Sequence, residues 1–290
     1  MSPRDFLIFF LVCLAWGLNN VVGKIVVTQL GCPPLAFVAA RFGIVALVTW
    51  RWLLPAPRPL WRIAIIGLLM GGAGFALLAL GLRTASPSAA AIVMQINVPL
   101  TTLLSVAMLG ERIDARRGTG IALTVAGALL VIWRPGGFTL SPGLLLVAAG
   151  AASGSLGAVM MKQMVDVRPL QFQAWVSFSS LFPLLGGSLL FESGQAGAMV
   201  AGGWPLLAAI LYSALIGSVA AHTAYYGLIA RYEANLIAPL TLMTPLATIG
   251  LGILITGDRF DGRMVAGALL AMAGVLVVAL RRPGSRAQTP

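Results

Sequence analysis

Ten long apolar runs, separated by short polar connections, fill most of this 290-residue sequence. Each run comes close to the roughly 20 residues that an α-helix needs to cross a bilayer. Strands of transmembrane barrels are about ten residues long and alternate polar with apolar side chains, and these runs do not alternate. The sequence therefore predicts an all-α membrane protein with ten transmembrane helices. The predicted spans are 6–27, 35–54, 61–81, 88–109, 117–133, 143–162, 170–191, 204–229, 234–256 and 263–280.

The composition argues against the main soluble classes of protein. Charged residues make up only 9% of the chain, against about 25% in soluble domains. The basic residues behind the net charge of +11 occupy the short connections between spans, so no nucleic-acid partner is expected. Cys13 and Cys32 cannot form a disulfide framework, and no spacing of Cys and His fits a metal or cofactor site. His222 is the only histidine and has no acidic partner, so we expect no enzyme.

The distribution of Lys and Arg predicts how the chain crosses the membrane. With the N-terminus in the cytoplasm, thirteen basic residues fall on the cytoplasmic side and four on the other, while Lys24 and Arg41 fall within spans. Since cytoplasmic connections carry the excess of positive charge, both termini are predicted to be cytoplasmic. The first run is too long for a cleavable signal peptide, so we expect it to remain as a span.

An internal repeat divides the chain into two halves. Residues 110–134 match residues 257–281 at a spacing of 147 positions, and PLAF at 34–37 is matched by PLQF at 169–172. We expect a five-helix repeat at 1–137, a second at 138–282 and a cytoplasmic tail at 283–290. Because five is odd, the second repeat must enter the membrane from the opposite side. Many secondary transporters have such inverted repeats; the alternative is a duplication that only built a stable bundle.

Several motifs carry a resemblance to a known family. They are AWGLNNVVGK in the first span, ARF at 40–42, GER at 110–112, and RYEANLIAPLTLMTPL at 231–246 followed by GDRF. The chain resembles the EamA-type branch of the drug/metabolite transporter superfamily over nearly its full length. The resemblance implies ten helices, a central cavity and export of small metabolites such as amino acids across a bacterial inner membrane. One departure is that Gly154 stands where the first half has Trp16, so the aromatic wall is asymmetric.

The first span carries a polar stripe. On a helical projection, Trp16, Asn19, Asn20 and Lys24 share one face about 140° wide. Such a stripe points to a bundle interior or a wet cavity, so the side chains either line a substrate path or only join neighbouring helices. The second half has Gly157, Ala158 and Lys162 at the positions of Asn19, Asn20 and Lys24, so the asparagine pair belongs to one half only.

Two cations within the spans lack an acidic partner there, because all eight acidic residues lie at predicted span ends or in loops. Lys24 either reaches the membrane interface or faces the cavity. Arg41 either bonds to backbone carbonyls and water or attracts the carboxylate of a ligand. Because no carboxylate lies inside a predicted span to carry a coupled proton, facilitated diffusion and proton antiport are both possible mechanisms.

Further polar and aromatic groups complete the candidate site. Gln95 lies in the fourth span, Trp175 beside Gln173 in the seventh, and His222 and Tyr225 beside Ser218 in the eighth. Pro99 and Pro245 bend the fourth and ninth spans, as gates or as static kinks. The predicted substrate-binding residues are Trp16, Asn19, Asn20, Lys24, Arg41, Gln95, Trp175, His222 and Tyr225.

These features favour a transporter that exports amino acids or related metabolites by alternating access through a central cavity. The expected partners are a small-molecule substrate and the lipid bilayer, and the chain is expected to act as a monomer without a metal or cofactor. Broad drug efflux, metabolite uptake and a receptor that transports nothing are the alternatives.

Overall fold

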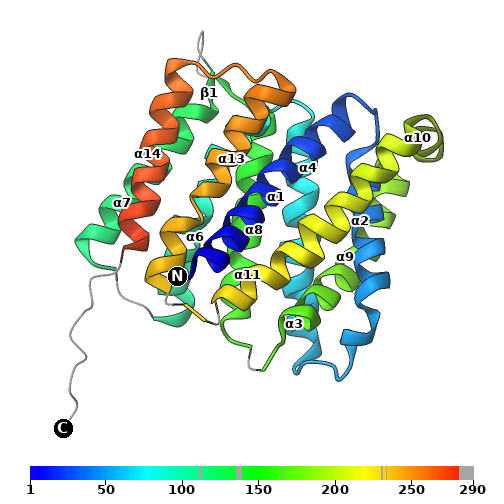
Figure 1. Cartoon of the computed structure of the whole chain (residues 1–290), viewed down its shortest axis with the longest axis horizontal. Coiled ribbons are helices and arrows are strands. Elements are labelled where there is room, and N and C mark those ends of the chain that lie inside the picture. Colours follow the sequence, from blue (N-terminus) through cyan, green and yellow to red (C-terminus); the bar gives the residue numbers. More distant parts are fainter. Residues whose placement is uncertain (111–112, 135–138, 165, 230, 233, 281–290) are drawn as a thin grey trace.

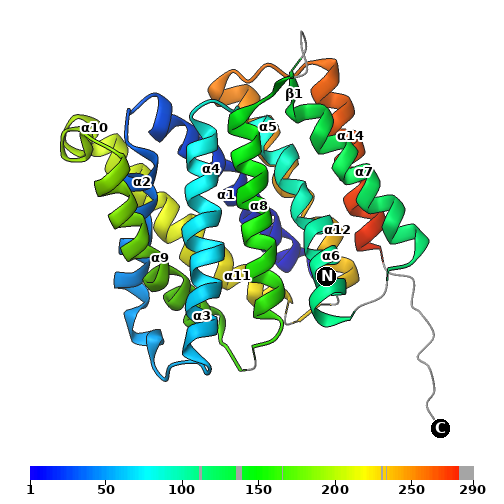
Figure 2. The same cartoon turned by 180° about the vertical axis from the view of Figure 1, so that it is seen from behind.

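The structure, a computed structural model, describes residues 1–110, 113–134, 139–164, 166–229, 231–232 and 234–280. Figures 1 and 2 show its helices lying side by side, seen from opposite sides. The first half comprises α1 (Pro3–Thr28), α2 (Pro34–Thr49), η1 (Trp50–Leu53), α3 (Leu60–Gly67), η2 (Leu68–Ala73), α4 (Gly74–Leu82), α5 (Pro87–Val93), η3 (Met94–Ile96), α6 (Asn97–Leu109) and α7 (Ala115–Ile132). A short strand pair follows, β1 (Trp133–Arg134) and β2 (Thr139–Leu140).

The second half repeats this order of helices. It comprises α8 (Pro142–Met161), α9 (Pro169–Phe191), α10 (Gln195–Leu211), η4 (Tyr212–Ala220), α11 (Ala221–Ile229), α12 (Ala234–Leu240), α13 (Met243–Leu251), η5 (Gly252–Thr256) and α14 (Gly262–Ala279). The segments η1 and η3 are 3-10 helices, and η2, η4 and η5 are π-helical. Consecutive segments such as α3, η2 and α4 form one span.

In the described residues, nine helices are long and apolar enough to cross a membrane. The remaining span, the ninth, predicted at 234–256, is broken, because α12 ends at Leu240 and the helix resumes only at Met243. Pro245 explains the break, since proline lacks an N–H and clashes with the carbonyl four residues earlier. Pro99 has the same effect in the fourth span, where the 3-10 turn η3 precedes it. The fold is therefore an all-α membrane protein whose ten spans include one interrupted helix.

The eighth span begins earlier than the sequence predicted. Its expected start is 204, but α10 begins at Gln195 and is kinked at Gly203, where φ is +48°. Left-handed backbone favours glycine, and Pro205 follows directly, so the kink has a local cause. The residues before the kink are mostly small or polar, so a search for long apolar runs does not include this first part of the helix.

The two halves meet in a close contact between α7 and α14. A Cβ added to Gly127 would lie 2.5 Å from the Gly267 oxygen, and one added to Gly120 would lie 2.8 Å from the Gly274 oxygen. In the repeat, Gly120 corresponds to Gly267 and Gly127 to Gly274. The contact is therefore reciprocal, as across a two-fold axis. Along the contact, residue numbers rise in α7 while they fall in α14, so the two helices run antiparallel. The second repeat is therefore inverted relative to the first.

Two carboxylates accept hydrogen bonds from the first residues of helices at one end of the bundle. This end lies opposite the N-terminus of the chain and is called the far end below. Glu192, which follows α9, accepts hydrogen bonds from the Leu35 and Ala36 nitrogens of α2 at 2.8 and 3.0 Å. Asp258, which follows η5, accepts from the Ser88 nitrogen of α5 at 2.8 Å and from the Ser88 hydroxyl at 2.5 Å. Negative charge at a helix N-terminus satisfies its free N–H groups. Each bond joins one half to the other.

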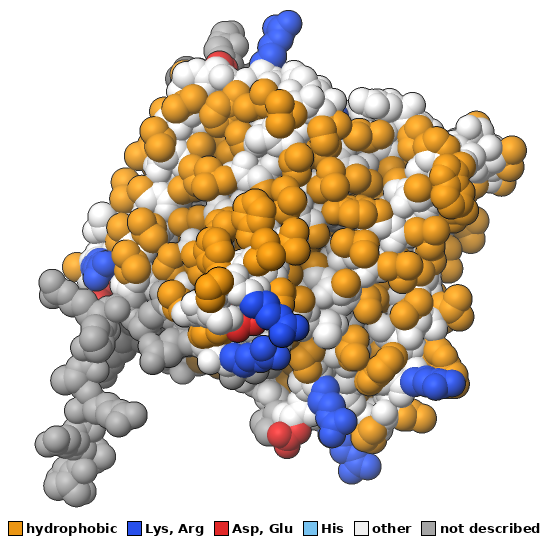
Figure 3. Space-filling model, viewed as in Figure 1, with side chains coloured by type: hydrophobic (Ala, Val, Ile, Leu, Met, Phe, Trp, Pro, Cys, Tyr) orange, Lys and Arg blue, Asp and Glu red, His pale blue; other side chains and the backbone are white. Residues whose placement is uncertain are grey.

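The outer surface has the character of a lipid-facing protein. Leu47, Leu189 and Leu254 are 73%, 76% and 81% exposed. Figure 3 shows hydrophobic side chains covering one face, with Lys and Arg gathered mainly along its lower edge. That edge is the end of the bundle where the chain begins, called the N-terminal end below.

Replacing Gly127 with alanine should destabilise the protein, because the new methyl group would collide with the α14 backbone. We expect a loss of about 1–3 kcal/mol, as for other overpacked sites, measured by thermal unfolding in detergent. Gly118→Ala is the matched control, since a Cβ at Gly118 in the same helix meets nothing within 4 Å. Equal melting temperatures for the two variants would contradict a seam set by backbone contact.

Candidate functional site

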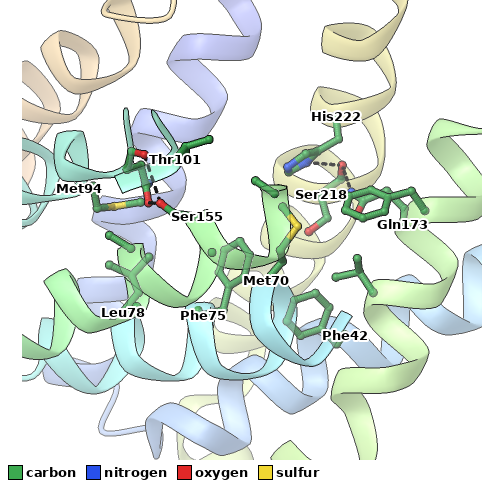
Figure 4. A pocket seen from close by; sticks show the side chains of 18 of the residues that line it. Phe42, Met70, Phe75, Leu78, Met94, Thr101, Ser155, Gln173, Ser218 and His222 are labelled. Carbon is green, nitrogen blue, oxygen red and sulfur yellow. Dashed lines mark hydrogen bonds between the residues drawn. The ribbon is translucent and has the colours of Figure 1, made fainter. Parts of the chain in front are cut away.

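A cavity of about 360 Å³ lies between the two halves. This size falls within the range of known small-molecule sites, roughly 300–1,000 Å³. The first half contributes α2 and the third and fourth spans, and the second half contributes α8, α9 and the eighth span (Figure 4). The side chains that matter for binding are Arg41, Phe42, Met70, Phe75, Leu78, Met94, Asn97, Thr101, Ser155, Phe172, Gln173, Ser218, His222 and Tyr226.

Polar groups converge on Ser218 at one side of the cavity. Arg41 Nε and Nη2 both donate to the Ser218 hydroxyl, at 3.0 and 2.8 Å. The Ser218 carbonyl accepts from Gln173 Nε2 at 3.0 Å and lies 3.0 Å from His222 Nδ1. The Ser218 hydroxyl in turn donates to the Ser213 carbonyl five residues earlier, at 3.0 Å. This spacing belongs to the π-helical η4, and such turns are frequent at functional sites.

Arg41 places a buried positive charge in this wall. The residue is 3% exposed, and its guanidinium lies 4.4 Å from the centre of the Phe75 ring. In the part of the chain that the structure describes, the ion pairs join Asp5 to Arg231 and Asp261 to Arg263, at span ends. No described carboxylate pairs with Arg41, so a serine hydroxyl and an aromatic face are what it contacts. The side chain can therefore offer its charge to a ligand.

A second polar group lies on the other side of the cavity. The Ser155 hydroxyl of α8 bonds to the Asn97 carbonyl and to Asn97 Oδ1, both at 3.2 Å. Figure 4 shows Ser155 and Thr101 facing the Ser218 group across a wall that contains Phe75 and other apolar side chains. The cavity thus has a cationic side, an oxygen-rich side and an apolar wall between them.

The stripe of the first span packs behind this wall and does not line the cavity. Trp16 Nε1 donates to the Gly217 carbonyl at 3.1 Å, and the Trp16 ring lies 5.0 Å from that of His222. Asn19 contacts Gly217 with its carbonyl oxygen buried and unbonded, and Asn20 Nδ2 donates to the Thr248 hydroxyl at 3.4 Å. The stripe therefore joins α1 to the eighth and ninth spans and supports His222 from behind.

The other predicted residues are more scattered. Lys24 Nζ donates to the Leu82 carbonyl at 2.8 Å, at the C-terminus of α4, where a cation is favoured. Trp175 Nε1 donates to the Leu53 carbonyl at 3.1 Å. Gln95 lies in η3. The Tyr225 ring makes an edge contact with that of Trp16, with ring centres 5.1 Å apart, and Pro99 and Pro245 are buried. Of the nine predicted binding residues, only Arg41 and His222 line the cavity.

Asn97, Thr101 and Ser155 were missed from the sequence. Asn97 and Thr101 are four residues apart on one face of α6, directly after the break that Pro99 causes, and this spacing was the available signal. Ser155 stands in the glycine-rich stretch of α8, which looked like a packing face. Within the described residues, no three His, Cys, Asp or Glu side chains are grouped to hold a metal ion.

Replacing Ser218 with alanine should destabilise the protein, because the buried Arg41 guanidinium would lose its hydroxyl partner. The expected loss is about 1.5–3 kcal/mol, the value for a hydrogen bond to a charged group, read as a lower melting temperature. Ser213→Ala is the control, since the Ser213 hydroxyl in the same segment is buried without a partner. If the two variants melt alike, the Arg41–Ser218 bonds do not stabilise the fold.

Comparison with known proteins identifies relatives along the whole chain. Two proteins named probable amino-acid metabolite efflux pump, from Salmonella typhimurium (strain LT2) and Escherichia coli (strain K12), are each 27% identical over 286 residues, 96% of this chain and 95% of theirs. The uncharacterized inner membrane transporter YedA of Escherichia coli (strain K12) is 26% identical over 279 residues, 92% of this chain and 88% of its own.

A solved crystal structure shares the fold, with a TM-score of 0.62 and 22% identity over 96% of both chains. The sequence model of the EamA-like transporter family matches residues 5–133 and, a second time, residues 141–280. The two matches confirm the resemblance noted in the sequence, and one falls on each half of the chain. Because they cover nearly all of the chain, this protein belongs to the EamA-like transporter family.

Proposed function

We propose that this protein exports amino acids or closely related carboxylate-bearing metabolites, by alternating access through the central cavity. Its family makes it a multi-pass inner-membrane transporter of small molecules, and not an enzyme. The observation that carries the finer proposal is Arg41, a buried cation on the cavity wall without a described acidic partner. The names of two relatives, probable amino-acid metabolite efflux pumps, agree with it.

The lining of the cavity suits a zwitterion with an apolar body. A guanidinium fork binds a carboxylate through two parallel hydrogen bonds, which are among the strongest in proteins. The oxygens of Asn97, Thr101 and Ser155 on the opposite side would accept from an ammonium group. Phe42 and Phe75 supply an apolar surface between these two sides. An α-amino acid carries all three kinds of group: a carboxylate, an ammonium group and, in leucine, an apolar side chain.

Arg41→Gln should reduce transport sharply while Arg41→Lys retains part of it, because lysine keeps the charge but loses the fork. We expect Arg41→Gln to lower kcat/KM at least tenfold, the equivalent of about 1.4 kcal/mol. The measurement is counterflow of labelled L-leucine and other amino acids into liposomes containing purified protein.

Arg58→Gln is the control, since Arg58 is exposed in a connection away from the cavity. Unchanged counterflow in Arg41→Gln would remove Arg41 from the binding site and leave it a packing role. Binding of leucine without any flux would instead support a receptor.

We also propose that both termini are cytoplasmic. The proposal is supported by the basic side chains at the N-terminal end (Figure 3). The protein is proposed to act as a monomer, because one chain supplies both sides of the cavity.

Single cysteines at two exposed arginines would report the orientation. In intact cells, a membrane-impermeant maleimide should label Arg83→Cys and not Arg4→Cys, and inside-out vesicles should reverse this pattern. Both positions are exposed, whereas the native Cys13 and Cys32 are each 1% exposed and should stay unlabelled. Labelling of Arg4→Cys in intact cells would invert the proposed topology.

A further inference from the structure

A second cavity, called the vestibule here, adjoins the central one. It has a volume of about 340 Å³, and its polar lining consists of Asn97, Thr101, Thr102, Ser105, Arg117 and Lys162. Asn97 and Thr101 also line the central cavity, so the two spaces border on the same two residues. The vestibule is therefore a polar space next to the cavity that Arg41 lines.

The vestibule lies toward the N-terminal end of the bundle. Lys162 directly follows α8, and Arg117 stands in the first turn of α7, so both cations mark the ends of spans. Lys162 Nζ donates to the Ser105 hydroxyl at 3.0 Å. Ammonium, guanidinium and hydroxyl groups around one space favour an anionic group such as a carboxylate.

The equivalent place at the far end has different chemistry. By the repeat, Arg117 corresponds to Met264, Val278 to Val131, and Lys162 to Lys24. Met264 and Val131 are buried in one apolar cluster, 5% and 2% exposed. The Lys24 ammonium donates to the Leu82 carbonyl at 2.8 Å. The pair of cations in the vestibule, Arg117 and Lys162, is therefore replaced at the equivalent far-end positions by Met264 and Lys24.

From this asymmetry we propose that the vestibule is a capture site for the carboxylate of the transported molecule on the N-terminal side. This inference rests on the proposed export of carboxylate-bearing metabolites and adds their first binding site and direction. A lysine and an arginine side chain at one space can bind the carboxylate of a zwitterion through charge-assisted hydrogen bonds. From the vestibule the carboxylate passes Asn97 and Ser155, whose hydrogen bonds must open, and reaches Arg41. At the equivalent place of the far end, Met264 stands in the position of Arg117, so the same pair of cations does not recur there.

The test is the KM for labelled L-leucine presented to the N-terminal side of purified protein in phosphatidylcholine liposomes. Lys162→Gln and Arg117→Gln should each raise KM roughly tenfold, as expected for loss of a hydrogen bond to a charged group, with little change in kcat. The salt dependence of KM should weaken in both. Arg116→Gln is the matched control, because Arg116 is exposed beside Arg117 and does not line the vestibule.

The outcomes separate the two proposals. Leucine counterflow that depends on Arg41, with a KM unchanged in both vestibule variants, would overturn the capture site and leave the proposed function standing. Absence of counterflow for every amino acid in the wild-type protein would overturn both.

An anionic lipid headgroup is the competing occupant of the vestibule. If it binds there, adding phosphatidylglycerol to the liposomes should raise the KM of the wild-type protein and not that of Lys162→Gln. That result would overturn capture of the substrate. An equal KM in both lipids supports it.

Discussion

The antiparallel contact of α7 with α14 is the constraint on which the rest of the structure depends. Gly120 and Gly127 meet Gly274 and Gly267 at backbone distance, so the two repeats are related by a two-fold axis through this seam. Inside a bilayer, apolar side chains gain little by leaving lipid, so close packing at small residues supplies the attraction between helices. Once the axis is fixed, the helices of the two halves that face each other are fixed too, and the central cavity is the space between them.

The two halves share the same order of helices, but different side chains from each half line the cavity. Trp16 packs against His222, while its counterpart Gly154 forms part of the cavity wall. A symmetric pair of cavities would bind a ligand equally from both sides. With Arg117 at one end and Met264 at the other, the two ends present different surfaces to an anionic group. The duplicated backbone therefore makes the two ends of the bundle related, and the side chains make them unequal.

The sequence predicted the spans and the inversion because both depend on simple counts, of apolar residues and of helices per repeat. It predicted the break near Gln95 because Pro99 acts on its own helix. A helical projection gave the polar face of α1 correctly but could not say which helices that face meets, so Trp16 and Asn19 were expected in the cavity and lie behind it. The Arg41–Ser218 bonds depend on a π-helical turn and on helices far apart in sequence, and neither has a local signal.

A turn of the same kind lies at the far end of the ninth span, and the two repeats differ in length there. Pro99 and Pro245 are 146 residues apart, whereas Gly110 and Gly257 are 147 apart. The additional residue falls between the proline and the glycine of the ninth span, where η5 is π-helical, and a π turn takes one more residue than an α turn. This turn brings Gly252 against Ser88 and Asp258, where a Cβ would lie 2.6 and 2.5 Å from their oxygens. At the N-terminal end, α6 continues as an α-helix to Leu109 and borders the vestibule. The repeats thus differ by one residue where the far end is closely packed and the N-terminal end has a cavity.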